Sequence, residues 1–150
     1  MLENRLNKGL DYFPLDLNFY DDIKFIKVRQ TYGYLGEIAY VRLLCMIYSE
    51  GYCLRMNIED LAYVLADGLS SGGYKVDTEK MINIINKYGE FGLLDKGNLA
   101  KDVITSHGIQ KQFLLCVTRR KFINTSVGWL LTKDEELRLI NKIMLRPEDL

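Results

Sequence analysis

The stretch of sequence that decides the fold is residues 57–89, NIEDLAYVLADGLSSGGYKVDTEKMINIINKYG. Asn57 and Asp77 each stand just before an amphipathic run, and side-chain oxygens of these residue types accept hydrogen bonds from the first free amides of a helix. Glycines that suit helix ends follow each run, at Gly68 and Gly89. A Leu-Ser-Ser-Gly-Gly segment supplies a flexible turn between the runs. The stretch therefore predicts two helices joined by a turn.

The second of these helices has two chemically distinct faces. Met81, Ile84, Ile85 and Tyr88 recur at helical spacing, so they predict one apolar stripe that packs inward. The opposite face is polar and carries Glu79, Lys80, Asn83, Asn86 and Lys87. We expect this polar face to meet solvent or a partner.

Two further helices and a short strand precede this pair. Asp21 is the predicted N-cap of a helix that runs to Tyr32, and Gly33 ends that helix. Residues 35–48 are apolar around most of the helix circumference, which predicts a central, buried helix. Residues 52–56 alternate enough to be a short strand.

A hairpin and two more helices are predicted after the pair. Phe91–Asp95 and Asp102–Thr105 have the pattern of two strands joined by a loop with turn chemistry. Ser106 can cap a helix that follows the hairpin directly. Thr132 and Glu135 have the spacing of a capping box at the start of a last helix.

This order of elements predicts the fold class. Over residues 34–105 it reads helix, strand, helix, turn, helix, strand, loop, strand, which is the order of a winged helix. We expect a mainly α protein with a small β-hairpin (α+β), a winged helix-turn-helix with an extra N-terminal helix and C-terminal helices. The predicted parts are an N-terminal arm (1–20), a winged-helix domain (21–121) and a C-terminal helical appendage (122–150). The arm should lay three aromatic side chains on the domain: Tyr12, Phe13 and Phe19.

The charge balance limits how nucleic acid could bind. Lys and Arg number 20, and so do Asp and Glu, so the whole molecule exerts no general attraction on DNA. The distribution is uneven, however, because no acidic residue occurs from Val103 to Lys133. Any DNA binding must therefore come from local basic patches.

Cysteine use and hydropathy indicate the cellular compartment. The three cysteines lack a Cys-x-x-Cys spacing, and Cys45 and Cys116 fall in apolar helical runs, where we expect small buried hydrophobes. No signal peptide and no apolar run of about 18 residues is present, so neither export nor a membrane span is predicted. A cytoplasmic protein with reduced thiols is expected.

The winged-helix order places the candidate DNA-contacting residues. In such folds the helix before the hairpin lies in the major groove, and the hairpin loop touches the flanking backbone. Lysines neutralise phosphates, and asparagines can pair with an adenine edge. The predicted contacts are Lys75, Thr78, Lys80, Asn83, Asn86, Lys87, Lys96, Asn98, Lys101, Lys111, Arg119, Arg120 and Lys121.

A structural interpretation of these residues stays open beside the functional one. Lys, Glu and Asn cover any solvated helix face, and Glu79, Glu90 and Asp95 offset the nearby lysines. Cations at a helix C-terminus, such as those of Arg119–Lys121, are favoured by the helix dipole alone. Element order predicts a fold and not a function.

The sequence gives little support for a catalytic role. His107 is the only histidine, and the spacings supply no set of three or four metal ligands. The paired carboxylates Asp21-Asp22 and Glu59-Asp60 stand at helix starts, where the dipole favours acids. No phosphate-binding loop motif is present. We expect a protein that is not an enzyme and binds no metal or cofactor.

Several motifs resemble one family over about residues 8–121. They are Gly-Leu-Asp-Tyr-Phe-Pro-Leu-Asp (9–16), Gly-Glu (36–37), Leu-Leu-x-x-Ile-Tyr-x-Glu-Gly-Tyr (43–52), Gly-Leu-Leu-Asp (92–95) and Ile-Thr-Ser-x-Gly-Ile-Gln-Lys (104–111), with Arg-Arg-Lys at 119–121. The chain is similar to the N-terminal domain of phage and mobile-element replisome organisers, the DnaD-like initiation proteins.

That resemblance implies a winged-helix domain that binds DNA, or initiator partners such as a helicase or its loader, during replication initiation. The relatives usually carry a longer C-terminal region, whereas residues 122–150 supply only one predicted helix. A protein-interaction or oligomerisation module of a replication complex, without direct DNA reading, is the alternative. Zero net charge, ten tyrosines and the arm favour it.

Overall fold

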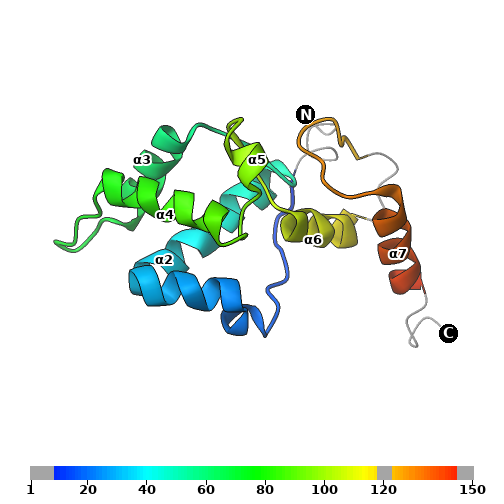
Figure 1. The fold of residues 1–150 in the computed structure, drawn as a ribbon, viewed down its shortest axis with the longest axis horizontal. Coiled ribbons are helices and arrows are strands. Elements are labelled where there is room, and N and C mark those ends of the chain that lie inside the picture. Colours follow the sequence, from blue (N-terminus) through cyan, green and yellow to red (C-terminus); the bar gives the residue numbers. More distant parts are fainter. Residues whose placement is uncertain (1–8, 118–122, 145–150) are drawn as a thin grey trace.

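The computed structural model describes residues 9–117 and 123–144. This part of the chain is mainly helical, with one two-stranded antiparallel sheet. Figure 1 shows α3 and α4 side by side at one end of the molecule and α7 at the other. The elements in chain order are η1 (Phe19–Asp21), α2 (Ile23–Glu50), β1 (Leu54–Arg55), α3 (Ile58–Leu69), α4 (Thr78–Glu90), α5 (Lys96–Leu99), β2 (Val103–Ile104), α6 (His107–Val117) and α7 (Lys133–Met144).

The two helices predicted from residues 57–89 are confirmed as α3 and α4. The Asn57 side chain accepts from the Asp60 N–H at 2.8 Å, and the Asp77 side chain accepts from the Glu79 N–H at 3.4 Å. These bonds satisfy amides that have no partner inside the helix. Each helix runs one residue past the predicted glycine, to Leu69 and Glu90. α3 packs directly against α4.

α2 contains both of the helices predicted before β1. They meet at Gly33, whose φ of 67° and ψ of −150° interrupt the helix at the predicted place. A residue with a Cβ is strained in this conformation, so glycine is required here. The predicted N-cap, Asp21, is wrong by one residue. Residues 19–21 form the 3₁₀ turn η1, and Asp22 follows it and accepts from the Lys24 N–H at 2.8 Å.

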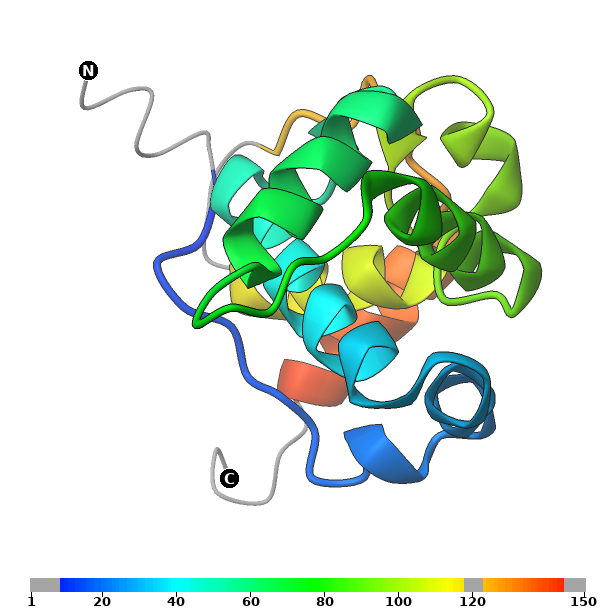
Figure 2. The same ribbon diagram turned by 90° about the vertical axis from the view of Figure 1, so that its left-hand side faces the viewer.

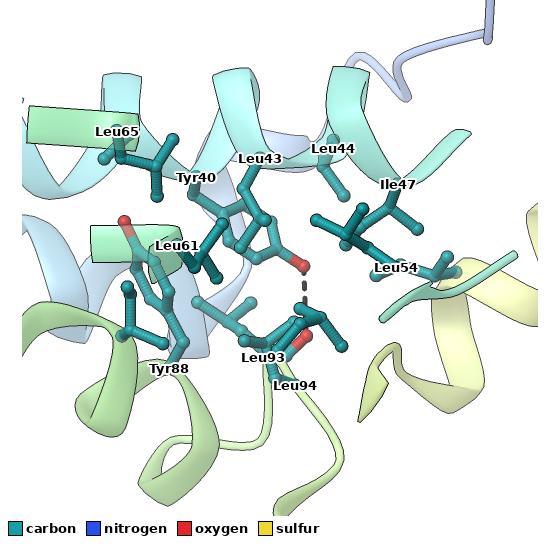
Figure 3. Close-up of a cluster of buried hydrophobic side chains, with 14 of the residues drawn as sticks. Tyr40, Leu43, Leu44, Ile47, Leu54, Leu61, Leu65, Tyr88, Leu93 and Leu94 are labelled. Carbon is teal, nitrogen blue, oxygen red and sulfur yellow. Dashed lines mark hydrogen bonds between the residues drawn. The ribbon is translucent and has the colours of Figure 1, made fainter. Parts of the chain in front are cut away.

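Two buried tyrosines tie α4 to the second half of α2. The Tyr88 hydroxyl, on α4, donates to the Gly36 carbonyl at 2.5 Å. The Tyr40 hydroxyl, on α2, donates in the opposite direction, to the Leu93 carbonyl just after α4, at 3.1 Å (Figure 3). Burial raises the pKa of both phenols, so both hydroxyls stay protonated and can donate. The central position predicted for the second half of α2 is thereby confirmed.

The predicted hairpin is wrong. Residues 91–95 form turns, and β2 pairs with β1, with Leu54 opposite Ile104. The physical reason is that the Leu93 and Leu94 N–H groups both donate to the Tyr88 carbonyl, which removes them from a strand ladder. The predicted loop holds a helical turn, α5. One backbone bond still joins the two segments, from the Asp95 N–H to the Thr105 carbonyl at 2.7 Å.

Two of the three predicted arm contacts are confirmed. The Phe13 ring stacks on Tyr48 with centroids 4.7 Å apart, and Phe19 packs on Phe25 at 4.3 Å. The prediction for Tyr12 is wrong, because this side chain is 85% exposed. The arm therefore covers α2 through two phenylalanines.

A buried glutamine fixes the segment that follows α6. Gln110 is fully buried and donates to the Thr105 hydroxyl at 3.1 Å and the Gly128 carbonyl at 2.8 Å. Its side-chain oxygen accepts from the Leu130 N–H at 2.6 Å. Because a buried amide needs such partners, these bonds hold residues 128–130 against α6. Beyond them, Thr132 forms the predicted capping box of α7 with Glu135.

The cysteines differ from the prediction. Cys45 and Cys116 are exposed, and Cys53 is partly buried. All three thiols are free. The apolar runs around Cys45 and Cys116 misled the prediction, because α2 and α6 each keep one face toward solvent.

Removal of either buried hydroxyl should weaken the fold. Tyr40→Phe and Tyr88→Phe should each lower the free energy of unfolding by about 1–2 kcal/mol, since each deletes a buried hydrogen bond. Urea denaturation measures this change. Tyr63→Phe is the matched control because Tyr63 is 67% exposed. If all three variants had the same free energy of unfolding, the role assigned to the two hydrogen bonds would be wrong.

Candidate nucleic-acid interface

α4 presents the polar face that the sequence predicts. Met81, Ile84, Ile85 and Tyr88 are fully buried, which confirms the inward stripe. The outward face consists of Glu79, Lys80, Asn83, Asn86, Lys87 and Glu90, of which Lys87 alone is half-buried. The hydrophobic stripe therefore sets which side chains α4 offers to a partner.

Four predicted contact residues lie together in one groove. Asn83, Asn86 and Lys87 line it from α4, and Lys96 lines it from α5. The helices α4 and α5 pack against each other (Figure 2). The groove has a volume of about 510 Å³. Its remaining walls come from Tyr32, Ile58, Glu90, Leu99 and Ala100. We call these nine residues the α4–α5 groove.

The charges of the α4–α5 groove are partly balanced. Lys87 Nζ lies 2.8 Å from a carboxylate oxygen of Glu90. The hydrogen bond between them raises the pKa of Lys87 and lowers the pKa of Glu90, and Lys96 lowers the latter further. Lys87 Nζ also lies 5.7 Å from the centroid of the Phe91 ring. One carboxylate thus sits between two lysines, and any anion that binds here must compete with Glu90.

A second basic site lies across the small sheet. Lys101 is exposed and shares a shallow groove of about 410 Å³ with Arg55, Asn57 and Asp102. Arg55 was missed by the sequence reasoning. The alternation of residues 52–56 contained the signal, because Leu54 is buried and Arg55 points to the other face of β1. Tyr32, at the end of the first half of α2, was also missed, and no local pattern indicates its place in the α4–α5 groove.

Asn98 has a role inside the fold. Its side-chain amide donates to Asp95 Oδ2 at 2.9 Å and to the Gly128 carbonyl at 3.3 Å. The second of these bonds joins α5 to the segment after α6. The amide is therefore already engaged, whereas those of Asn83 and Asn86 make no hydrogen bond within the described part of the chain.

The remaining predicted contacts lie away from the α4–α5 groove. Lys75 is exposed in the loop before α4, and Thr78 and Lys80 lie in the first turn of α4. Lys111 is exposed on α6 near Glu135. Burial raises the pKa of the Glu135 carboxyl. Hydrogen bonds from Thr132 and His107, together with the nearby charge of Lys111, outweigh this effect, so the pKa is lowered. The cluster of Arg119, Arg120 and Lys121 lies outside the described residues.

Within residues 9–117 and 123–144, no three His, Cys, Asp or Glu side chains lie together in a way that could hold a metal ion. No helix in that part of the chain is long and apolar enough to cross a membrane.

Comparison with known proteins gives a family and one phage-related relative. Residues 12–109 match the family described as Lin1244/Lin1753-like, N-terminal. The chain is 26% identical over 141 residues to the "Uncharacterized phage-related protein Lin1244/Lin1753" of Listeria innocua serovar 6a. That match covers 93% of the chain but 44% of the relative, so the chain spans less than half of the relative's length. No solved structure matches the chain.

The different placements of the asparagines predict different effects on stability. Asn98→Ala should lower the free energy of unfolding by about 1–2 kcal/mol, because it removes two hydrogen bonds inside the fold. Asn86→Ala, on the exposed face of α4, is the matched control and should stay within about 0.5 kcal/mol of the unaltered protein. Thermal or urea unfolding compares them. Equal stabilities of the two variants would contradict the internal role of Asn98.

Proposed function

The chain belongs to the Lin1244/Lin1753-like N-terminal family, and on that premise we propose that it is a DNA-binding protein of phage origin. We propose further that it has a winged-helix fold, acts in replication initiation as part of a replisome or primosome, and has no catalytic activity. The name of the Listeria relative supports the phage origin. The motifs that resemble replisome organisers support the role in replication, with a helicase or its loader as the protein partner.

The fold supports a variant of the winged helix. The order helix, strand, helix, helix, strand is retained, and β1 pairs with β2. α5 stands where a winged helix has the loop of its hairpin, and its first residue, Lys96, faces the groove beside α4. Both elements that would contact DNA in a winged helix thus border one surface.

The observation that carries the proposal is the set of side chains in the α4–α5 groove. Two amides, Asn83 and Asn86, line this groove together with Lys87 and Lys96. Amide groups read base edges, and lysines neutralise the phosphates on either side. A zero net charge makes a general electrostatic attraction unimportant, so binding should depend on these particular lysines.

Reversal of the groove's positive charge should abolish most of the binding. The double variant Lys87→Glu/Lys96→Glu should bind DNA at least about tenfold more weakly at low salt, because two phosphate contacts are lost. The slope of log affinity against log salt should become shallower by about two. Fluorescence anisotropy with a labelled oligonucleotide measures both quantities.

Two variants control this experiment. Lys133→Glu reverses one lysine charge on α7, at the other end of the molecule (Figure 1), and should leave the affinity nearly unchanged. Glu90→Gln removes the carboxylate that competes for Lys87 and should raise the affinity severalfold. If Lys133→Glu weakened binding as much as the double variant does, the assignment of the α4–α5 groove would be wrong.

A specific observation favours self-association as a second candidate function. Four large apolar side chains within residues 15–23 are exposed, and Leu17 is 96% and Ile23 is 63% exposed. Leu15 and Tyr20 complete this exposed set. Large exposed apolar surface marks interaction sites in proteins.

Self-association makes a direct prediction about molecular mass. Light scattering should report a mass that rises toward the dimer with concentration, and Leu17→Ser/Ile23→Ser should restore the monomer because it removes apolar area from the interface. Tyr34→Ser, at a side chain that is 85% exposed on α2, is the control. A monomer at every concentration would exclude this candidate, whatever the result with DNA.

A further inference from the structure

We propose that the α4–α5 groove holds one unstacked base of single-stranded DNA, and that it prefers a base with an exocyclic amino group. This inference rests on the proposed DNA-binding function and specifies the ligand of the same site. It is carried by the groove's shape, its amides, Tyr32 and Glu90.

The shape of the site favours a single base over the duplex. A helix that reads the major groove must project from the protein so that the duplex can close around it. Asn83 and Asn86 instead line a groove whose other residues come from α5 and the segment just after it, and from Tyr32 and Ile58. Its volume of about 510 Å³ lies within the range of small-molecule pockets, roughly 300–1,000 Å³. A flat, unstacked base fits such a site.

The two amides are available to a ligand. In residues 9–117 and 123–144, neither the Asn83 nor the Asn86 side chain makes a hydrogen bond, whereas that of Asn98 makes two. An amide both donates and accepts, so it can pair with the edge of a base. The Watson–Crick edge is open only when the base is unpaired.

Tyr32 supplies an aromatic ring beside these amides. Its hydroxyl donates to the Asn83 carbonyl at 3.5 Å, which places the ring in the same wall as the α4 side chains. Proteins that bind single strands stack bases on aromatic rings. Lys87 and Lys96 can then contact the phosphates on either side of the bound base.

Glu90 gives the site its preference among bases. A carboxylate repels a phosphate in the groove but accepts a hydrogen bond from an exocyclic amino group, as in recognition of cytosine. Cytosine, adenine and guanine carry such a group, whereas uracil and thymine carry only carbonyl oxygens, and uracil has one at the position of the cytosine amino group. The Glu90 carboxylate should therefore favour cytosine over uracil.

The test compares oligodeoxycytidine with oligodeoxyuridine of equal length. The two bases differ only at C4, which carries an amino group or a carbonyl oxygen, and at N3, which accepts a hydrogen bond in cytosine and donates one in uracil. Anisotropy titrations of the intact protein, above neutral pH, should show tighter binding to the cytidine strand than to the uridine strand or to a duplex of equal length. Glu90→Gln should reduce the difference between the two strands. Equal affinities for both strands would overturn the inference.

Substitutions of Tyr32 form the second part of the test. Tyr32→Leu should weaken single-strand binding by roughly tenfold or more, through loss of stacking. Tyr32→Phe keeps the ring and should bind almost as the unaltered protein does, while Tyr34→Leu on the exposed side of α2 is the control. Urea unfolding establishes that each variant is folded. If Tyr32→Leu does not fold, the comparison of cytidine and uridine strands decides alone.

The outcomes separate the inference from the proposed function. If Lys87→Glu/Lys96→Glu weakens binding but folded Tyr32→Leu does not, the DNA-binding function stands and the base site is wrong. If a duplex binds more tightly than both single strands, the base site is again wrong. If no DNA binds even at low salt, the proposed function fails and the inference fails with it.

Discussion

The reciprocal pair of tyrosine hydrogen bonds is the constraint on which the rest of the structure depends. Tyr88 of α4 reaches the Gly36 carbonyl of α2, and Tyr40 of α2 reaches the Leu93 carbonyl beyond α4. The two rings also meet edge to face, with centroids 5.1 Å apart. A buried hydroxyl is costly without a partner, so the two bonds fix both the rotation and the position of α4. The outward direction of Asn83 and Asn86, and the place of Tyr32 beside them, follow from that arrangement.

Much of the helical structure could be predicted because its signals are local. Asn57 and Asp77 cap their helices through neighbouring amides, and Gly33 interrupts α2 where its φ is positive. The prediction of a strand at residues 91–95 was wrong, because the apolar residues of this run pack into the core from a turn. Leu93 and Leu94 are both buried in the core although they are adjacent, which an alternating strand does not allow. Only the tertiary packing around Tyr88 shows this.

The candidate site was predicted in part for a similar reason. Helical spacing placed Asn83, Asn86 and Lys87 on one face of α4, but it could not show that Lys96 lies beside them on α5. The sequence also could not separate Asn98 from the other asparagines, because its partner carbonyl, that of Gly128, is 30 residues away. Long-range contacts thus separate the predicted polar residues that support the fold from those that face solvent.

The central claim is that DNA binds at the α4–α5 groove, and an NMR titration of the isotopically labelled protein tests it most directly. Addition of a single-stranded oligonucleotide at low salt should shift the backbone amide signals of residues 83–90 and of α5, together with that of Tyr32, while signals from α7 stay in place. The shifts should vanish as salt is added, because phosphate contacts release counterions. Shifts confined to residues 15–23, or no shifts at any DNA concentration, would contradict the account.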